Sequence, residues 1–524
     1  MSADQPTPPS DLTDDPAVLK QMVRQMTQQI QEQNRRIEQL THQLNLLLRR
    51  TFGHRAETVD ESQLRLAFAE LARESEEPVP PAPEVEAENL LGTPPEPGTI
   101  KPRKGHGRGR LPEHLRRERI EYPLSEAERA CPDCGSLREK FGEEITEQLD
   151  YVPASLVVKQ HVRFKYACRS CQEHVAVAPL PSQPIEKGLP GAGLLAQVLV
   201  GKFGDHVPLH RQAGIFQRHG LRISPSTLGD WVEEGARLLE PLVREKKRSI
   251  LGSHVVQTDD TPVPVLDHAR KHTRLGRLWT YLGDEEHPYI VYDYSPDRSG
   301  KHPQKFLENF RGRLQADAYP GYDALYRVDP GTGEARVIEV GCMAHCRRKF
   351  YEAQTTDVVR SLATVAYIRL LYQVEKEARG LDPPARRALR QEKAKPWMDK
   401  LKIWLEAQQK EVLPKSPFAE AANYALSQWT ALTRYLDDGR LEIDNNGAER
   451  ALRSVAVGRK AWTFAGSDAG GERAAVIYSV IQSARRHGLE PFAYLRDLLA
   501  RIPTHSQLRL AELLPDRWTP SEIK

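Results

Sequence analysis

The sequence lacks the features that mark membrane proteins and secreted proteins. It contains no run of 18 apolar residues, so no segment is long enough to cross a bilayer as a helix. The first 16 residues are polar and do not contain the apolar core of a secretory signal. Only six cysteines occur in 524 residues, which is too few for a disulfide framework. These absences predict a protein of the reducing cytoplasm that has no membrane partner.

A strong excess of charge of one sign is also missing. The formal net charge is only +3, so bulk charge does not indicate a partner, and contact with phosphates would need local clusters of Lys and Arg. A chain of 524 residues with 39 prolines is expected to hold several globular parts joined by linkers.

A heptad repeat stands near the N-terminus. Asp15 and Pro16 read as the cap and first residue of a helix, and apolar residues then alternate at spacings of four and three over four heptads. This pattern predicts a parallel two-stranded coiled coil, with Gln33 as the one polar residue of its seam; the alternative is a helix packed on its own protein. The seam residues are Leu19, Val23, Met26, Ile30, Gln33, Ile37, Leu40, Leu44 and Leu47.

A second helix is predicted over residues 60–74, and the composition then changes twice. Residues 77–98 are rich in Pro and Glu and read as a linker. Residues 101–110, KPRKGHGRGR, form a basic, Gly-rich arm that is suited to nucleic acid, although a solvated tether has the same composition.

Four cysteines form two Cys-x-x-Cys pairs, Cys131 with Cys134 and Cys168 with Cys171. Two such pairs suit a tetrahedral zinc site with four thiolates, and a structural site of this kind closes all four positions. The strand-like run between the pairs predicts a β-ribbon on which Lys159, His161, Arg163 and Lys165 would share one face.

Residues 190–243 are predicted to be helical. GLLAQVLVGKF reads as one apolar helix, and RQAGIFQRHG followed by SPSTLGDW reads as two helices separated by a turn at Gly220. This layout resembles a helix-turn-helix, although plain helical packing explains it equally well.

After Ile250 the pattern changes to strands. The segments HVVQTDD, TPVPVLD, GRLWTYLGD and PYIVYDYS are successive strand candidates, followed by a helix at SGKHPQKFLENF, a strand at RLQADAY and a strand leading into a helix at RVIEVGCMAHCRRKFYEA. Alternating strands and helices predict an α/β layer, and the helical residues 358–440 read as an insertion into it.

Three acidic residues are candidates for one site. Asp259 and Asp317 lie where two predicted strands end, and Glu449 lies on a predicted helix for which Asp444 is a plausible N-cap. Three carboxylates at one edge of a sheet would supply the oxygen ligands that two hard cations need. On residue pattern alone, the stretch from Leu441 to Ala475 reads equally well as a helix with a solvated, charged face.

Several longer motifs resemble those of one known family. They are TDDTPVPVL at 258–266, LQADAYPGYDALY at 314–326, GCMAHCRRKF at 341–350 and IDNNGAERALRSVAVGRKAWTFAGSDAGGERAA at 443–475. With these motifs and others along nearly the whole chain, the sequence resembles a DDE transposase of the insertion sequence 66 family.

The resemblance implies an RNase H-like catalytic core in which Asp259, Asp317 and Glu449 are the acid triad. It further implies two Mg²⁺ (or Mn²⁺) ions per active site, hydrolysis at the element ends, and transfer of the freed 3′-hydroxyl to target DNA. The expected fold is multidomain α/β, with a large α-helical insertion in the core, an N-terminal coiled coil, a zinc-binding β-ribbon, a helix-turn-helix-like domain and a C-terminal helical tail.

Neighbouring residues compete for some of these roles. Asp260 is adjacent to Asp259 but would point to the opposite face of a strand, and Glu442 and Glu472 match Glu449 in chemistry. The family motif selects Asp259 and Glu449, with Asn445 and Asn446 as supports. Because the implied chemistry needs no nucleophilic Cys, Cys342 and Cys346 are expected to be thiols of the core or thiols that support the site from behind. His345, Arg347 and Arg348 either face the phosphate or only begin a helix.

The expected partners are DNA, a second copy of the chain through the coiled coil, and accessory proteins of the same element. The candidate DNA contacts are Arg103, Lys104, Arg108, Arg110, Lys159, Arg163, Lys165, Arg347, Arg348, Arg450, Arg453, Arg459 and Lys460.

The predicted boundaries divide the chain into nine parts. They are residues 1–15 (disordered), 16–74 (coiled coil), 75–110 (linker and arm), 111–185 (zinc-binding), 186–248 (helix-turn-helix-like), 249–357 (core), 358–440 (insertion), 441–487 (core) and 488–524 (tail). Two alternative functions remain: a transposase-derived DNA-binding protein without activity, and a metal-dependent nuclease with an RNase H-like core.

Overall fold

The computed structural model describes residues 156–161, 165–166, 176–177, 182–186, 188–267 and 272–521. The predicted coiled coil, the linker, the basic arm with Arg103, Lys104, Arg108 and Arg110, and also Arg163 lie outside these residues. All four cysteines of the predicted zinc site, Cys131, Cys134, Cys168 and Cys171, lie outside them as well. The chain divides into two compact units, residues 83–179 in one and the remainder in the other, and each is described by itself.

In the smaller unit, two short strands pair antiparallel. Strand β1 (Lys165–Tyr166) faces β2 (Ala176–Val177), so the partner of β1 comes after the second cysteine pair. The expectation of a ribbon strand running through Lys159 and His161 is wrong, because residues 156–161 have no regular structure. Val157 and Val158 are 78% and 86% exposed, so this stretch lacks the covered face that would favour a strand at these β-branched residues.

In the larger unit, three helices precede the sheet as predicted. Helix α4 (Ala192–Phe203) is apolar, α5 (Leu209–Arg218) ends before Gly220, and α6 (Pro225–Ile250) follows. Gly220 adopts φ +81°, a left-handed conformation that glycine reaches without strain. Ser224 caps α6 by accepting a hydrogen bond from the Thr227 amide at 3.1 Å. The apolar face of α6 is buried in the core, as the alternative of plain helical packing predicted. DNA contact by the helix pair α5 and α6 stays a prediction.

Five strands form one mixed sheet in the order β5-β4-β3-β6-β7. Strands β3, β4 and β5 are antiparallel neighbours, whereas β6 and β7 run parallel to β3. The strands are β3 (Val255–Asp267), β4 (His272–Leu282), β5 (Ile290–Ser295), β6 (Gly312–Gln315) and β7 (Val337–Val340).

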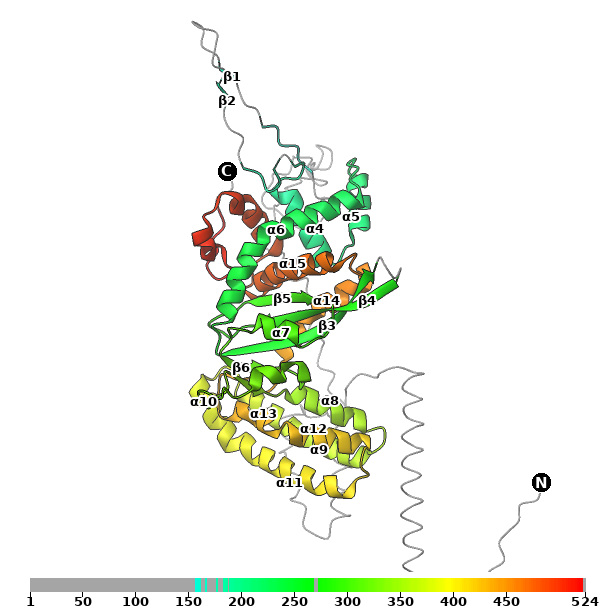
Figure 1. The fold of residues 1–524 in the computed structure, drawn as a ribbon, viewed down its shortest axis with the longest axis vertical. Helices are drawn as coiled ribbons and strands as arrows, with labels where there is room; N and C mark the ends of the chain where they lie inside the picture. Colours follow the sequence, from blue (N-terminus) through cyan, green and yellow to red (C-terminus); the bar gives the residue numbers. More distant parts are fainter. Residues whose placement is uncertain are drawn as a thin grey trace, which may run out of the picture. The chain divides into compact units, whose positions relative to one another are not determined.

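Helices cover both faces of this sheet (Figure 1). Side chains of β4 alternate between the two faces, as expected for a strand buried on both sides. Trp279 and Tyr281 pack on α7 (Lys301–Phe306) and the 3-10 helix η1 (Pro320–Tyr326), with the Tyr281 and Phe306 rings stacked. On the other face lie α14 (Asn446–Trp462) and α15 (Asp468–Arg486).

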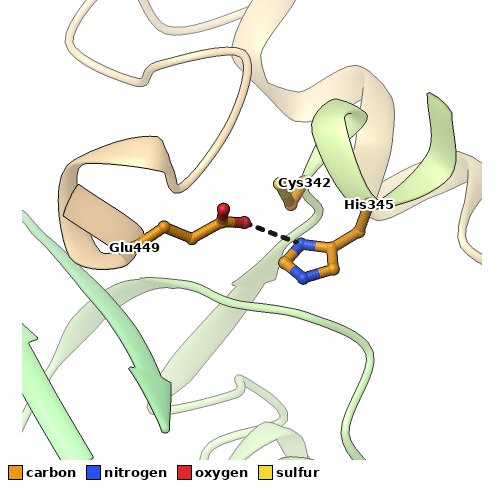
Figure 2. Close-up of side chains that lie close together, drawn as sticks. All are labelled: Cys342, His345 and Glu449. Atoms are coloured by element: carbon orange, nitrogen blue, oxygen red, sulfur yellow. Dashed lines mark ion pairs between the residues drawn. The ribbon is translucent and has the colours of Figure 1, made fainter. Parts of the chain in front are cut away.

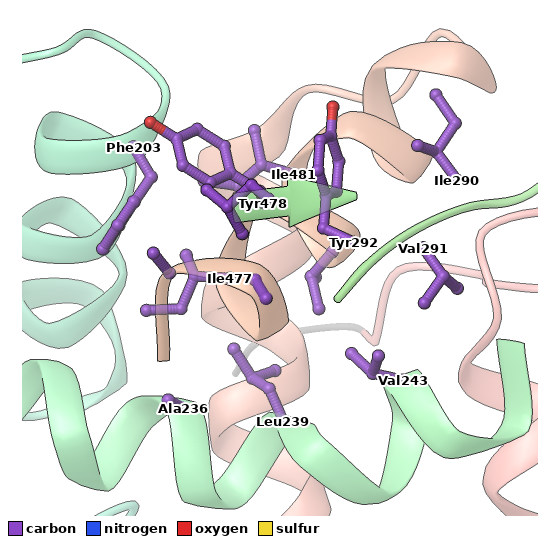
Figure 3. Close-up of a cluster of buried hydrophobic side chains, with 14 of the residues drawn as sticks. Phe203, Ala236, Leu239, Val243, Ile290, Val291, Tyr292, Ile477, Tyr478 and Ile481 are labelled. Atoms are coloured by element: carbon purple, nitrogen blue, oxygen red, sulfur yellow. The ribbon is translucent and has the colours of Figure 1, made fainter. Parts of the chain in front are cut away.

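Aromatic and aliphatic side chains from distant segments fill the core beneath α15. The rings of Phe203 and Tyr478 meet edge to face with centroids 5.2 Å apart, and Tyr292 from β5 packs on Tyr478 at 5.7 Å (Figure 3). Leu239 of α6 and Ile477 of α15 complete the contact between these helices (Figure 3). Burial of such side chains stabilises the fold by about 1.5–3 kcal/mol each.

The predicted helical insertion has its own hydrophobic core. Its side chains pack with those of α8 (Met343–Ala353), and Phe350 and Phe418 meet at its centre. The insertion contains α9 (Val358–Glu377), α10 (Pro383–Leu389), the π-helix η2 (Arg390–Ala394), α11 (Lys395–Glu411), α12 (Pro417–Ser427), α13 (Trp429–Thr433) and the 3-10 helix η3 (Arg434–Leu436).

The chain closes with helices, as predicted. Helix α16 (Pro491–Arg501) and the 3-10 helices η4 (Ile502–Thr504) and η5 (Gln507–Leu513) pack beside α4 and α6. Among the described residues, no helix combines the length and apolarity needed to span a membrane.

Candidate active site

Two of the predicted acids are brought together by strand register. Gln257 of β3 is paired with Gln315, the last residue of parallel strand β6. Asp259 and Asp317 each lie two residues further along, just beyond the end of the parallel ladder. The expectation that the first strand ends at Asp259 is wrong, because β3 runs on to Asp267 with β4 as its only partner strand. It is β6 that ends here, and this opens the sheet beside both acids.

Glu449 joins them from the first turn of α14. This helix buries Ala448, Ala451, Leu452 and Val455 along one face, which fixes its orientation on β3. The prediction that Asp444 is the N-cap is wrong by one residue, because the cap position is Asn445. Asp444 instead accepts hydrogen bonds from the Asn446 amide at 3.1 Å and from the Tyr372 hydroxyl at 2.8 Å, and so ties the helix start to the insertion.

The three carboxylates influence one another electrostatically. Burial raises the pKa of Asp259 to about 7, and the negative charges of Asp317 and Glu449 act in the same direction. Burial raises the pKa of Asp317 above its ordinary value, and His345 and Arg298 nearby only partly oppose this increase. Carboxylates that repel each other in a partly buried site gain stability when a cation neutralises them.

Two buried glutamines hold the start of α14 against the strands. Gln257 Nε2 donates to Gln315 Oε1 at 3.0 Å and to the Asp444 carbonyl at 3.2 Å. Gln315 Nε2 donates to the Glu442 carbonyl at 2.7 Å. The two glutamine side chains therefore bind the backbone segment that leads directly to Glu449.

Gly447 and Asn445 complete this junction. A Cβ at Gly447 would lie 2.3 Å from Gln257 Oε1, so only glycine permits this approach of α14 to β3. Asn445 Nδ2 donates to the Thr258 carbonyl at 3.2 Å, between Gln257 and Asp259. Its Oδ1 is buried and has no hydrogen-bond partner.

Asp260 serves a different purpose from Asp259. Its side chain is only 3% exposed and accepts from Arg277 at 3.0 Å and from Arg298 at 2.9 Å. Arg298 also lies 3.6 Å from Asp317 Oδ2. Asp260 thereby holds a guanidinium beside the acid cluster. The strand register pairs the two adjacent acids with successive residues of β4, so they point to opposite faces as expected.

Side chains from α8 approach Glu449 from the side of the insertion. His345 Nδ1 lies 3.6 Å from Glu449 Oε1 (Figure 2). Arg348 lies 3.7 Å from Glu449 Oε2. Cys342 and Cys346 are both buried, and burial raises the pKa of each thiol to about 12, as expected of thiols that are not nucleophiles.

The competing glutamates lie elsewhere. Glu442 is exposed and pairs with Arg386 at 2.9 Å. Glu472 is exposed on α15, where its charge acts on Asp293 of β5. Of these three glutamates, Glu449 is the one whose charge acts on Asp259.

The predicted DNA contacts fall into two groups. Arg450, Arg453 and Lys460 are exposed along α14, whereas Arg459 donates to the Thr261 hydroxyl at 2.9 Å and to the Pro262 carbonyl at 2.6 Å. Arg459 therefore links α14 to β3, because its guanidinium binds the strand on the side that has no neighbouring strand.

The residues present fit a hard divalent cation. Glu449 Oε1 and Asn445 Oδ1 are buried acceptors without a hydrogen-bond donor, and a buried acceptor left unpaired costs about 1–3 kcal/mol. Three carboxylates with these oxygens form the type of ligand set that Mg²⁺ or Mn²⁺ takes.

Sequence reasoning missed the two glutamines and Arg298. The glutamines had a visible signal, because Gln-x-Asp occurs in both VVQTDD and LQAD at the same distance from the acid. Arg298 lies in a loop after β5 and shows no pattern that links it to either aspartate.

Comparison with known proteins decides the family. Residues 187–473 match the Transposase IS66 family, residues 128–172 match the zinc-finger binding domain of transposase IS66, and residues 479–515 match the IS66 C-terminal element. Residues 39–120 match the family described as Transposase C of IS166 homeodomain. The chain belongs to the IS66 family of transposases. It is thus a transposase of an insertion sequence, as the motifs predicted.

Relatives of this IS66 transposase occur in Sinorhizobium fredii (strain NBRC 101917 / NGR234). Uncharacterized protein y4jD is 34% identical over 511 residues, which cover 95% of this chain and 98% of the relative. Uncharacterized protein y4hP is 37% identical over 427 residues, which cover 78% and 76% of the two chains. The match of the zinc-finger family spans Cys131 to Cys171 and supports zinc binding there.

Proposed function

We propose that this IS66 transposase cleaves phosphodiester bonds at the ends of its element and joins the 3′-hydroxyl ends to target DNA. Asp259, Asp317 and Glu449 are the catalytic and metal-binding residues in this proposal. The observation that carries it is the register of β3 and β6, which sets two aspartates at matched positions beyond the Gln257–Gln315 pair. Glu449 reaches the same place from α14.

We infer that residues 249–357 and 441–487 form one RNase H-like core, interrupted by the insertion 358–440. The support is the sheet itself, in which three antiparallel strands are followed by two parallel ones in the order β5-β4-β3-β6-β7. Helices lie on both faces, and the segment 437–446 returns from the insertion directly to Glu449.

The chemistry needs placement and charge neutralisation more than a covalent nucleophile. Two bound Mg²⁺ (or Mn²⁺) ions would neutralise the phosphate and activate the attacking oxygen. The chain's own cations then orient the DNA. Arg298 and Arg348, each within 3.7 Å of an acid of the triad, are placed to bind non-bridging phosphate oxygens. Arg347, Arg450, Arg453 and Lys460 are proposed to bind the flanking backbone.

The remaining modules serve assembly and recognition in this proposal. Cys131, Cys134, Cys168 and Cys171 bind one zinc, and the zinc-binding domain with the basic arm binds the terminal inverted repeats. The coiled coil over residues 16–74 pairs two protomers, because two element ends must be joined together. Small proteins of the same element are proposed partners.

A metal-dependent nuclease is the second candidate, since the same three acids would serve hydrolysis alone. The test is an incubation of the purified protein with DNA carrying the element's own ends, target DNA and Mg²⁺. Transposition predicts joined products on a gel. Nicks without joining would favour the nuclease, and binding without any nick would favour an inactive DNA-binding descendant.

A further inference from the structure

Three different metal-binding atoms meet between α8 and α14. Cys342 Sγ, His345 Nδ1 and a carboxylate oxygen of Glu449 all lie within 4.8 Å of one another (Figure 2). Cys342 is the residue before α8 and His345 is in its first turn, so their three-residue spacing puts both on the side that faces Glu449. The acid triad uses Glu449 but has no role for the sulfur or the imidazole.

Two of the three metal-binding atoms are not engaged with other partners. His345 Nδ1 and Glu449 Oε1 are buried, 3.6 Å apart, and neither has a hydrogen-bond partner. In tetrahedral zinc sites with bonds of about 2.0–2.3 Å, ligand atoms are about 3.3–3.8 Å apart. The His345–Glu449 separation thus matches two ligands of one ion better than a hydrogen bond.

The surroundings leave the inner atoms available. Arg348 lies 3.7 Å from Glu449 Oε2, the other oxygen, so Oε1 is left for a ligand. The Asn445 amide donates to Cys342 Sγ at 3.4 Å, a contact that suits a sulfur bearing negative charge. The Met343 amide donates a hydrogen bond to the Ile443 carbonyl at 3.1 Å, which fixes the start of α8 beside the segment that leads into α14.

We propose that Cys342, His345 and Glu449 bind a borderline-soft transition metal, Zn²⁺ in the first place, at a site distinct from the four-cysteine zinc site. A sulfur, a nitrogen and one oxygen suit Zn²⁺ and disfavour Mg²⁺, which takes oxygen ligands. The fourth tetrahedral position stays open to water or a phosphate oxygen. In the proposed function, Glu449 also binds the catalytic ions, and the next step rests on that function. Zinc bound at this site therefore inhibits Mg²⁺-dependent cleavage.

Binding is tested on the full-length protein whose four-cysteine site is already filled with one equivalent of zinc. Co²⁺ added beyond this equivalent should produce the near-ultraviolet absorption of a cobalt–thiolate bond in the unmodified protein. The Cys346→Ser variant is the matched control, because Cys346 is an equally buried cysteine one helical turn away that does not belong to the three-atom cluster. It should keep the absorption, whereas Cys342→Ser should lose it.

A second variant guards against misfolding of Cys342→Ser. His345→Gln should weaken cobalt binding by at least about tenfold, since even loss of a partner behind a metal ligand costs about 10- to 100-fold in affinity. Absence of the thiolate absorption in the unmodified protein, or its persistence in Cys342→Ser, would overturn the site.

Inhibition is measured separately, by adding Zn²⁺ to the Mg²⁺ reaction on end DNA. The zinc concentration for half-inhibition, taken relative to each protein's own rate, should rise at least about tenfold from Cys346→Ser to Cys342→Ser. Equal values would overturn the sharing of Glu449. Absence of Mg²⁺-dependent cleavage in every protein would contradict the proposed function, while the cobalt absorption would still decide the metal site.

Discussion

At the scale of single residues, the geometry of the acid cluster depends on groups that do no chemistry. Gly447 leaves room for Gln257, and Asp260 holds Arg298 beside Asp317. Such groups set the distance between Glu449 and the two aspartates. A displacement of about 1 Å in a site of this kind can reduce a rate by about 100-fold.

Gly447→Ala tests this dependence. The new Cβ would lie 2.3 Å from Gln257 Oε1 and 2.7 Å from Leu282 Cδ2, so α14 must move outward. We expect a loss of about 1–3 kcal/mol in the free energy of unfolding, as for other overpacked positions, and a much larger fractional loss of cleavage. Urea titration and a cleavage assay measure the two effects.

Gly229→Ala is the control, because a Cβ at this position in α6 meets no atom within 4 Å. It should raise stability by about 0.5–1 kcal/mol through the lower helix propensity of glycine. Unchanged cleavage in Gly447→Ala would show that α14 does not need its close approach to β3.

Residue identities were the most predictable part of the site. The three acids were selected by family motifs, and the structure brings them together; their catalytic role stays a proposal. Residue chemistry did not separate Glu449 from Glu442, because both are glutamates close to the start of α14. Glu442 lies just before the helix and Glu449 lies in its first turn. Only the packing of α14 turns one toward Asp259 and the other toward Arg386.

At the scale of elements, the length of β3 was the main misreading. Two strands were expected, at HVVQTDD and TPVPVLD, and the second segment contains two prolines, which normally interrupt a ladder. Both prolines lie beyond the end of β6, where one side of β3 has no strand partner. The carbonyls of Pro262 and Pro264 are bound on that side by Arg459 and the Ala465 amide, so no ladder hydrogen bond is lost to proline.

The sheet edge formed by β5 is protected by α15. The amides of Ile290 and Tyr292 donate to the hydroxyls of Ser483 and Ser479, at 3.1 and 2.8 Å. Serines four residues apart on one helix face therefore replace a neighbouring strand, which prevents the pairing of this edge with another chain. No sequence pattern predicted this contact, since it joins residues almost 200 positions apart.

The strand-to-helix junction can be tested with Gln315→Met, which keeps the side-chain volume. The carbonyl of Glu442 and the amide of Gln257 lose a buried partner, at an expected cost of about 1–3 kcal/mol in the free energy of unfolding. Cleavage should fall as well, because the segment that leads to Glu449 is released. Gln217→Met on exposed α5 is the control for both measurements; equal behaviour of the two variants would contradict the role of Gln315.

At the scale of the whole molecule, two hydrophobic cores meet at the acid cluster. One core joins the sheet with α4, α6, α15 and α16, and the other joins α8 with the insertion. Asp259 comes from a strand of the first, and His345 comes from a helix of the second. The succession of strands and helices along the chain and the helical insertion were predicted from sequence periodicity. The order of the strands in the sheet and the meeting of the two cores depend on packing that no local pattern encodes.

Global stability should carry a pH dependence from Lys246. This lysine is fully buried in α6, donates to the Ser479 carbonyl at 3.3 Å, and burial lowers its pKa from 10.5 to about 7. Between pH 10.5 and 7 the unfolded chain binds a proton that the folded chain does not, so folding stability from this group falls as the pH is lowered. The loss is about 1.4 kcal/mol per pH unit across this window, and it is complete below pH 7.

Lys246→Met should therefore stabilise the protein most near pH 7 and least near pH 10. Denaturant unfolding at both pH values, with exposed Lys410→Met as the control, measures the difference. A gain that is the same at both values would mean that Lys246 keeps its proton in the folded protein.

The central claim is that Asp259, Asp317 and Glu449 form one site for DNA strand transfer. Its most direct test compares Glu449→Gln with Glu442→Gln, a matched change on an exposed glutamate of the same loop and helix junction. We predict that Glu449→Gln binds element ends normally but loses joined product by at least about 100-fold, whereas Glu442→Gln joins ends at the rate of the unmodified protein. Strand transfer retained by Glu449→Gln, or lost equally in both variants, would contradict the account.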